Sequence, residues 1–192
     1  EDGYLNANSH SFVVTKYGLE EKIKRDGFDY IAGEQRGECS ITKLESGMID
    51  YDEVLRFILD LIERNQWNVR AICYDPWSFS YLLPEFEKRD LPMVEVRQGR
   101  LTLSIPTVRF RDDLFNGKLK HPDNQLLAYA VNNAILKYDS NNNALIDKAK
   151  NATKIDPLAA LMNAYTIAMN SITTTENSEE MSRFYASDDF GF

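Results

Sequence analysis

The sequence predicts an α/β domain whose central sheet is at least partly parallel. Three observations support this prediction. The chain has 192 residues, with 43% hydrophobic and 27% charged residues, which is the composition of an ordinary globular domain. Helical and strand-like segments alternate between residues 38 and 99, as in βαβ units. Within them, residues 69–75 are apolar without alternation, as expected of a central strand buried on both faces.

The first elements follow from short local patterns. Residues 10–17 alternate weakly and are rich in β-branched and aromatic side chains, which predicts a strand. Residues 19–27 form a short helical pattern that ends at Gly27. Residues 38–47 are predicted to form a strand followed by a turn.

The most regular helical pattern covers residues 51–65. Asp50 precedes it as a predicted N-cap, with Glu53 in the capping-box position. The apolar side chains of one face are Val54, Leu55, Ile58, Leu61 and Ile62. A second helix is predicted over residues 78–89, with Phe79, Leu82, Leu83 and Phe86 on one side. The next strand is predicted over residues 93–99.

The second half of the chain is predicted to be mostly helical. Residues 110–119 and 124–134 have helical patterns, and residues 135–149 indicate two short strands around an Asn-rich turn. Residues 156–170 predict a helix whose core face carries Leu158, Leu161, Met162, Tyr165 and Met169. Periodicity is lost afterwards, so we expect a domain over residues 1–170 and a tail over residues 171–192.

Composition and missing motifs exclude several classes of protein. No apolar run approaches the roughly 20 residues that span a membrane. The formal charge of −8 argues against a strongly basic nucleic-acid module without excluding a carboxylate-rich one. Cys39 and Cys73 are expected to be buried thiols in a reducing compartment, not a disulfide framework or a zinc site. The chain has neither a phosphate-binding loop nor a GxSxG motif. With no initiator Met, we expect a fragment or a processed product.

Two Asp-Pro pairs are the candidate chemical sites. Asp75 ends the apolar segment 69–75 and precedes Pro76, so it can form a turn or present a carboxylate at the carboxyl edge of the sheet. Asp156 precedes Pro157 at a predicted helix start, where an N-cap is the simpler interpretation. Two carboxylates that converge at one sheet edge can bind a divalent metal. These residues alone leave both alternatives open.

Basic residues gather in the part of the sequence between these two carboxylates. One group includes Arg100, Lys118 and Lys120, and Lys154 lies shortly before Asp156. Such residues form either an ordinary solvated surface or a set of phosphate contacts around an acidic centre. His10 and His121 are isolated, and we expect structural roles for both.

The order of several motifs resembles a known family. The sequence reads "YDPW", then "VEVRQG", then "LSIPTVRFRDDLFNGKLKHPDNQLLAYAVNNAILKYD", and finally "KIDPLAALMNAYTIA". Together with the upstream segment "GFDYIAGEQRGECSITKLESGMIDYDEV", these motifs resemble the nuclease domain of the large terminase subunit of tailed phages. The resemblance covers residues 10–170, and it is the order and spacing of the motifs that carry it.

The resemblance implies a ribonuclease H-like fold, with a mixed five-stranded sheet flanked by helices. It also implies two Mg²⁺ or Mn²⁺ ions and hydrolysis of a DNA phosphodiester. Asp75 then matches the second acidic metal ligand of the family, and Asp156 matches the third. Gln98 is expected to line the DNA groove near the metals, whereas Trp77 is expected to be a packing residue.

One part of the family pattern is not found. The strand that carries the first acidic residue has no match here, and neither does the ATPase motor that precedes the nuclease. We therefore expect a sheet without its first strand. Asp188 or Asp189 of the tail could substitute for the missing carboxylate, which is a weaker hypothesis. Asp50 is another acidic residue, for which we favour the N-cap role.

The leading functional hypothesis is a metal-dependent endonuclease domain that cuts concatemeric double-stranded DNA during phage genome packaging. Its expected partners are DNA, the portal protein and the small terminase subunit, in the host cytoplasm and without a membrane. Two alternatives remain. One is a catalytically inactive fragment that docks on DNA or on the portal. The other is a different ribonuclease H-like nuclease, of the resolvase or transposase type.

Overall fold

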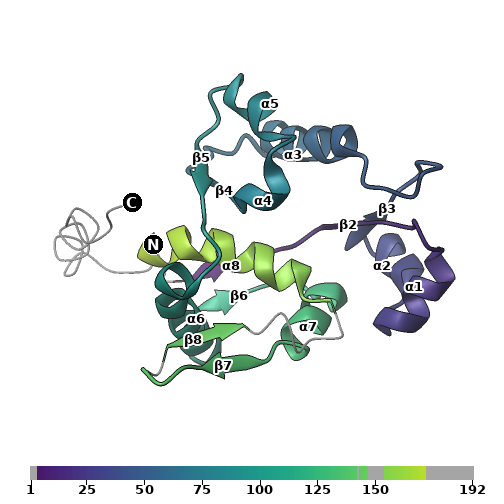
Figure 1. Cartoon of the computed structure of the whole chain (residues 1–192). Helices are drawn as coiled ribbons and strands as arrows, with labels where there is room; N and C mark the ends of the chain where they lie inside the picture. Colours follow the sequence, from purple (N-terminus) through teal and green to yellow (C-terminus); the bar gives the residue numbers. More distant parts are fainter. Residues whose placement is uncertain (1–3, 142, 147–153, 172–192) are drawn as a thin grey trace.

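The computed structural model describes residues 4–141, 143–146 and 154–171 (Figure 1). The first half contains β1 (Leu5–Asn6), β2 (Ser11–Val13), α1 (Leu19–Asp26), α2 (Tyr30–Gln35), β3 (Cys39–Ile41), α3 (Tyr51–Asn65), β4 (Ile72–Tyr74), α4 (Pro76–Phe79), α5 (Leu83–Glu87) and β5 (Met93–Glu95). The second half contains α6 (Arg100–Phe115), β6 (Leu119–Lys120), α7 (Gln125–Asn132), β7 (Leu136–Tyr138), β8 (Ala144–Ile146), α8 (Asp156–Ala168) and the 3₁₀ turn Met169–Ser171.

The strands form pairs and not one sheet among the described residues. Three pairs are parallel (β1–β6, β2–β3 and β4–β5), and the hairpin β7–β8 is antiparallel. The five-stranded mixed sheet that the family resemblance implies is therefore not seen as one sheet in this part of the chain, for which we expected a sheet without its first strand. The physical reason is that β2 and β4 each pair on one side only, with no described strand between them.

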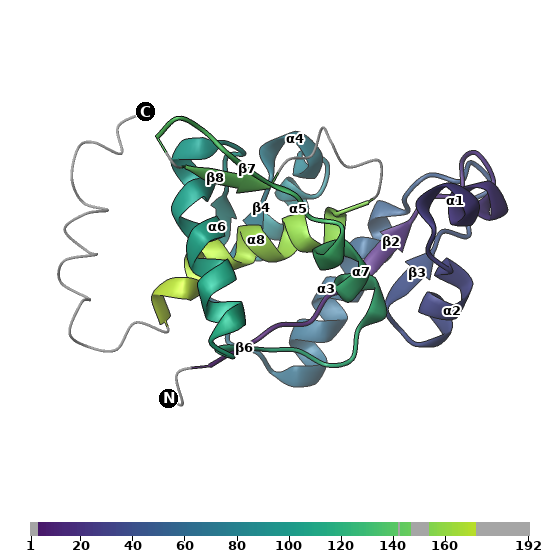
Figure 2. The same cartoon turned by 90° about the horizontal axis from the view of Figure 1, so that it is seen from below.

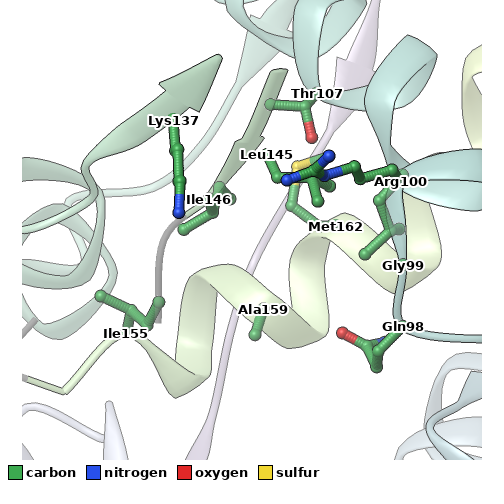
Figure 3. Close-up of a pocket in the computed structure, with 11 residues that line it drawn as sticks. Gln98, Gly99, Arg100, Thr107, Lys137, Leu145, Ile146, Ile155, Ala159 and Met162 are labelled. Atoms are coloured by element: carbon green, nitrogen blue, oxygen red, sulfur yellow. The ribbon is translucent and has the colours of Figure 1, made fainter. Parts of the chain in front are cut away.

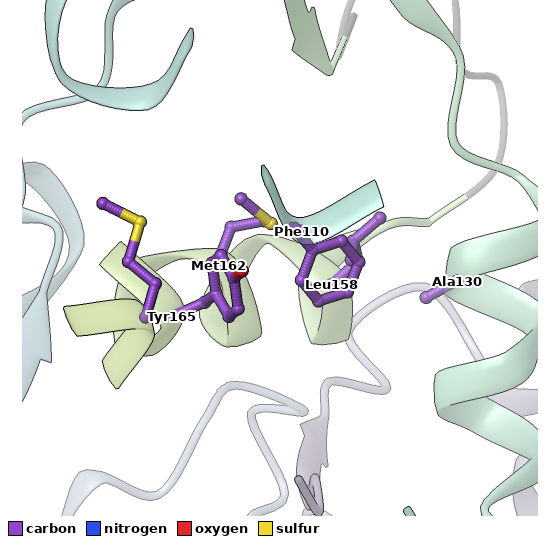
Figure 4. Packing of buried hydrophobic residues seen from close by; sticks show 6 residues of the cluster. Phe110, Ala130, Leu158, Met162 and Tyr165 are labelled. Atoms are coloured by element: carbon purple, nitrogen blue, oxygen red, sulfur yellow. The ribbon is translucent and has the colours of Figure 1, made fainter. Parts of the chain in front are cut away.

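Helix α8 lies at the centre of the molecule in both views (Figures 1 and 2). It packs against α6 and α7 and also contacts β4. Phe110, Ala130, Leu158, Met162 and Tyr165 form its main hydrophobic cluster (Figure 4), and each is at most 8% exposed. Met169, from the turn after α8, completes this cluster. The core face predicted for residues 156–170 is confirmed, except that Leu161 is only half-buried.

Helices α1 and α2 form a lobe at one end of the molecule, away from the β7–β8 hairpin (Figure 2). Helix α1 ends at Gly27, whose φ of +69° lies in the left-handed region that favours glycine. Helix α2 begins after Asp29, whose side chain accepts hydrogen bonds from the backbone N–H groups of Ile31 and Ala32. The lobe is held to α7 by a second hydrophobic cluster, in which Leu126 packs with side chains that include Tyr30.

The region around α3, β4 and β5 is much less buried. Helix α3 has the predicted bounds and the predicted Asp50 cap, but none of its side chains is buried. Strand β4 is half-buried, so the prediction of a central strand buried on both faces is wrong for the described structure. Trp77 is 92% exposed, so the packing role predicted for it is wrong as well. It is the second residue of the four-residue helix α4.

Three other predictions were corrected by the structure. The single helix expected over residues 78–89 is divided into α4 and α5, because Pro84 prevents a continuous helix through that segment. Helix α6 begins at Arg100, ten residues before the predicted start, and contains Pro106. Helix α2 was not predicted at all. The hairpin predicted over residues 135–149 is confirmed as β7 and β8.

Cys39 and Cys73 are both free thiols, as predicted, but only Cys39 is buried, whereas Cys73 is half-buried. Among the described helices, none is both long and apolar enough to cross a membrane. The predicted tail, including Asp188 and Asp189, lies outside the described residues beyond Ser171.

Candidate active site

Asp75 lies directly after β4, at the carboxyl end of a parallel strand pair. Its backbone is extended (φ −86°, ψ 119°), and its side chain accepts a hydrogen bond of 3.2 Å from the backbone N–H of Trp77. Asp75 therefore caps the short helix α4, while Pro76 occupies the first position of that helix. One backbone hydrogen bond leaves most of the acceptor capacity of a carboxylate available. The turn interpretation and the metal-ligand interpretation are thus compatible at this residue.

Asp156 is the first residue of α8 and not its N-cap. The cap position is occupied by Ile155, and no side chain makes a capping hydrogen bond there. The predicted N-cap interpretation of Asp156 is therefore wrong, because the helix begins one residue earlier than expected. The Asp156 side chain is exposed in the first turn, where the helix dipole stabilises a negative charge.

A hydrogen bond between side chains joins the end of β5 to α8. Gln98 Nε2 donates to Asn163 Oδ1 at 2.9 Å, and Asn163 is only 8% exposed. Asn163 follows Asp156 by seven residues, which is close to two helical turns, so the two residues share one face of α8. The face of α8 that bears Asp156 is therefore the face turned toward the end of β5. Asn163 was missed from the sequence, because its partner Gln98 is 65 residues away in the chain.

The segment before Asp156 is fixed by buried polar residues of the α1–α2 lobe and α7. The hydroxyl of Tyr129 donates to the backbone carbonyl of Asp26, and the backbone N–H of Lys154 bonds to the same hydroxyl. Burial raises the pKa of Tyr129, and the nearby Asp26 raises it further. Burial also raises the pKa of Tyr30, with additional contributions from Asp26 and Asp156. Asp156 therefore begins its helix beside a well-ordered cluster of protonated tyrosines.

Asp26 is the carboxylate at the centre of this cluster. It is 2% exposed and contacts Lys22 at 3.3 Å, Arg25 at 2.8 Å and the hydroxyl of Tyr30 at 3.0 Å. Burial would raise the pKa of Asp26, but the hydrogen bonds from Arg25 and Tyr30 together with the charge of Lys22 outweigh it and lower the pKa. Asp26 is thus committed to a structural ion network.

The predicted DNA-contacting residues fall into two groups. Gln98 and Arg100 lie together at the start of α6, where Arg100 Nη1 contacts Asp139 Oδ2 at 3.3 Å. Lys118 and Lys120 lie beyond the other end of α6, a helix whose 16 residues span about 24 Å. Lys118 contacts Asp113 at 3.7 Å, and Lys120 lies 3.6 Å from the ring centre of Tyr4. Lys154 is exposed, two residues before Asp156.

Two other sequence candidates have structural roles. Asp50 caps α3 by accepting hydrogen bonds from the backbone N–H groups of Asp52 and Glu53. His10 contacts the carbonyl of Gly37 at 3.0 Å and the hydroxyl of Ser40 at 2.9 Å, and its ring stacks on Phe57. Both roles agree with the predictions.

The donor chemistry of Asp75 and Asp156 suits a hard divalent cation. Neither carboxylate forms an ion pair with a described Lys or Arg, whereas Asp26, Glu38 and Asp113 all do. Mg²⁺ commonly binds through one or two carboxylates together with water and substrate phosphates. The described residues contain no group of three or more acidic, His or Cys side chains placed to hold a metal. This part of the chain thus offers two candidate carboxylate ligands, next to elements that contact each other.

Comparison with known proteins finds one with a similar sequence and a similar structure. The large terminase subunit of Enterobacteria phage HK97 is 24% identical over 164 residues, which make up 84% of this chain and 32% of that protein. The crystal structure of the HK97 bacteriophage large terminase matches with a TM-score of 0.68 and 23% identity, over 78% of this chain and 31% of that chain. The chain thus spans about a third of the length of this relative.

The structural match shows that the described residues share the fold of part of the HK97 large terminase, despite the separate strand pairs. A model of the family described as "Terminase large subunit, endonuclease domain" matches residues 1–171. The family resemblance found in the order of the sequence motifs is thereby confirmed. This chain belongs to the endonuclease domain family of the terminase large subunit.

Proposed function

We propose that this chain is a metal-dependent endonuclease domain that cuts concatemeric double-stranded DNA during phage genome packaging. The observation that carries the proposal is the pair Asp75 and Asp156. Both carboxylates lack a described cationic partner, and they stand at the ends of two elements that contact each other. The family membership over residues 1–171 gives this pair its chemical context.

In this proposal Asp75 and Asp156 are the protein ligands of Mg²⁺ or Mn²⁺. The bound ions would activate a water molecule and stabilise the leaving 3′ oxygen of the phosphodiester. The backbone N–H of Trp77 holds one oxygen of Asp75, which orients this carboxylate toward the carboxyl edge of β4. The hydrogen bond from Gln98 to Asn163 fixes the face of α8 on which Asp156 lies.

The cationic side chains nearest to this pair would neutralise DNA phosphates. Lys154 lies two residues before Asp156 and Arg100 lies at the start of α6, whereas Lys118 and Lys120 lie beyond the other end of α6 and would contact a different part of the duplex. With a formal charge of −8, the isolated chain should bind DNA weakly at physiological salt. The portal protein and the small terminase subunit are the proposed partners that keep DNA in place, in the host cytoplasm.

One observation favours a second candidate function. The described residues supply two acidic ligands and not a cluster of three. A domain that has lost its nuclease activity and docks on DNA or on the portal would also agree with this count. The two candidates differ in cleavage and not in DNA binding.

Plasmid cleavage separates them. The chain is incubated with supercoiled plasmid in Mn²⁺, with EDTA and with the Asp75→Ala variant as controls. The nuclease proposal expects nicking and linearisation in Mn²⁺ alone, and loss of both in each control. If DNA stays intact in Mn²⁺ while the chain still binds it, the docking function is supported and the nuclease proposal fails.

A further inference from the structure

A cavity of about 400 Å³ lies beside the start of α8, between α6 and the β7–β8 hairpin. Ile155 and Ala159 form its side toward α8, and Gln98 and Gly99 form the side toward β5. Ile155 directly precedes Asp156. The cavity is therefore next to the candidate active site, at the start of α8.

The cavity combines an apolar interior with two cations. Leu103, Leu145, Ile146 and Met162 are among the apolar residues that line the interior. Arg100, from α6, and Lys137, from the hairpin, reach toward the same space from opposite sides (Figure 3). Lys137 forms no ion pair with any residue that the structure describes, so its charge is available to a ligand.

The charge of Arg100 is also only partly used within the chain. Among the residues that the structure describes, its carboxylate contact is with Asp139, at 3.3 Å, and its side chain remains 55% exposed. Asp139 in turn accepts hydrogen bonds from the backbone N–H groups of Asn141 and Asn143, both at 2.9 Å. Since a guanidinium carries five N–H donors, Arg100 can hold Asp139 and bind an anion at the same time.

The walls of the cavity are held in place before any ligand arrives. Ser104 accepts a hydrogen bond from the backbone N–H of Ala144 at 3.2 Å, which fastens the hairpin to α6. Arg111 donates to the hydroxyl of Tyr138 at 3.1 Å and makes a second connection. A preformed pocket avoids the cost of ordering its walls when it binds.

We infer that this cavity holds one unpaired nucleotide of a DNA strand, with its phosphate between Arg100 and Lys137 and its sugar and base against the apolar interior. The inference rests on the proposed function, because it takes DNA as the ligand. A volume of about 400 Å³ lies in the range of small-molecule pockets and is too small for a duplex. The two cations match a phosphate, and the apolar interior matches a base that has left its stack.

A binding experiment without cleavage tests this inference. Fluorescence anisotropy compares a blunt duplex with the same duplex bearing a three-nucleotide single-stranded overhang, in Ca²⁺ in place of Mn²⁺. We expect the intact chain to bind the overhang probe about tenfold more tightly, as is typical when one base is held on a protein surface. Equal affinity for the two probes would overturn the inference.

Two lysine substitutions provide a matched pair. Lys137→Glu is expected to remove the preference for the overhang, whereas Lys43→Glu should leave it intact. Both lysine side chains are exposed, and both substitutions change the charge by the same amount. Lys43 lies in the turn after β3 and not at the cavity. Equal effects of the two substitutions would contradict a site at Lys137.

Salt dependence and steric filling give two further measurements. Lys137→Ala should lower the slope of log affinity against log salt for the overhang probe by about 0.7, the value of one phosphate contact in a single strand. Ala159→Leu should fill the cavity and weaken binding of the overhang probe, while binding of the blunt duplex should not change. Because these measurements need no cleavage, they can fail while the plasmid assay succeeds, and the reverse also holds.

Discussion

The region around α7 and α8 and the region around α3, β4 and β5 differ in how firmly they are packed. Helix α8 buries five of its residues, whereas α3, which is longer, buries none. Asp156 begins the well-packed helix, and Asp75 ends a half-buried strand that pairs on one side only. The two candidate ligands are therefore held by elements that are packed to different extents.

The largest expected difference is in core truncations. Leu158→Ala removes a side chain that is 2% exposed in α8 and should lower the free energy of unfolding by about 3 kcal/mol. Leu61→Ala removes a half-buried side chain of α3 and should cost about 1 kcal/mol. Urea unfolding followed by circular dichroism measures both. Equal losses would show that α3 is packed as firmly as α8.

The buried ion network at Asp26 gives the next largest effect. Asp26→Asn should destabilise the chain by about 2 kcal/mol, because it removes the charge that holds Lys22, Arg25 and the hydroxyl of Tyr30. Since the pKa of Asp26 is lowered in the folded state, this stabilisation is complete above the ordinary carboxyl value of 3.8. It is lost as the pH falls below 3.8 through the lowered pKa.

Unfolding curves between pH 7 and pH 2.5 measure this dependence. The difference between the wild type and Asp26→Asn should be constant down to about pH 4 and then shrink. Asp52→Asn, at an exposed position in α3, serves as the control and should show no such convergence. A difference that stays constant to pH 2.5 would contradict a lowered pKa at Asp26.

The hydrogen bond between Gln98 and Asn163 connects the two regions. Gln98→Ala leaves Oδ1 of the buried Asn163 without this donor and should cost about 1 kcal/mol of stability. Plasmid cleavage should fall about tenfold, as is common when a residue that orients a metal ligand is lost. Combining Gln98→Ala with Asn163→Ala should cost less than the sum of the two single effects. Fully additive effects would show that the bond does not couple the regions.

The smallest effect is expected at the cap of α3. Asp50→Ala removes the acceptor of two backbone N–H groups and should cost about 0.5 kcal/mol, at the low end for an N-cap because the helix is exposed. Cleavage of plasmid DNA should be unchanged. A large loss of cleavage with unchanged stability would show that Asp50 acts in the active site and not only as a helix cap.

Elements with strong local patterns could be predicted from the sequence. Helix α3 has the predicted bounds, because its apolar period and its Asp50 cap agree with each other. Helix α2 was missed because six residues are too few to show a period, although Asp29 offered a capping signal. The first half of α6 was missed because Pro106 argues against a helix, yet the helix continues past it.

The candidate site was predictable only in part, because local sequence patterns do not show contacts between distant segments. Asp75 and Asp156 were found through the order of the family motifs, since each Asp-Pro pair alone is also an ordinary turn or helix start. Asn163 was not found, because its importance comes from a contact between distant segments. Gln98 and Asn163 are 65 residues apart in the sequence, and no local pattern indicates that pairing.

The most direct test of the account is Mn²⁺ binding, measured by the electron paramagnetic resonance signal of the free ion. We expect Asp75→Asn and Asp156→Asn each to weaken Mn²⁺ binding by at least about tenfold, since each removes one of the two proposed carboxylate ligands of the same site. The control Asp52→Asn should bind as the wild type does. Wild-type affinity in both variants would contradict the claim that these two carboxylates, from differently packed regions, form one metal site.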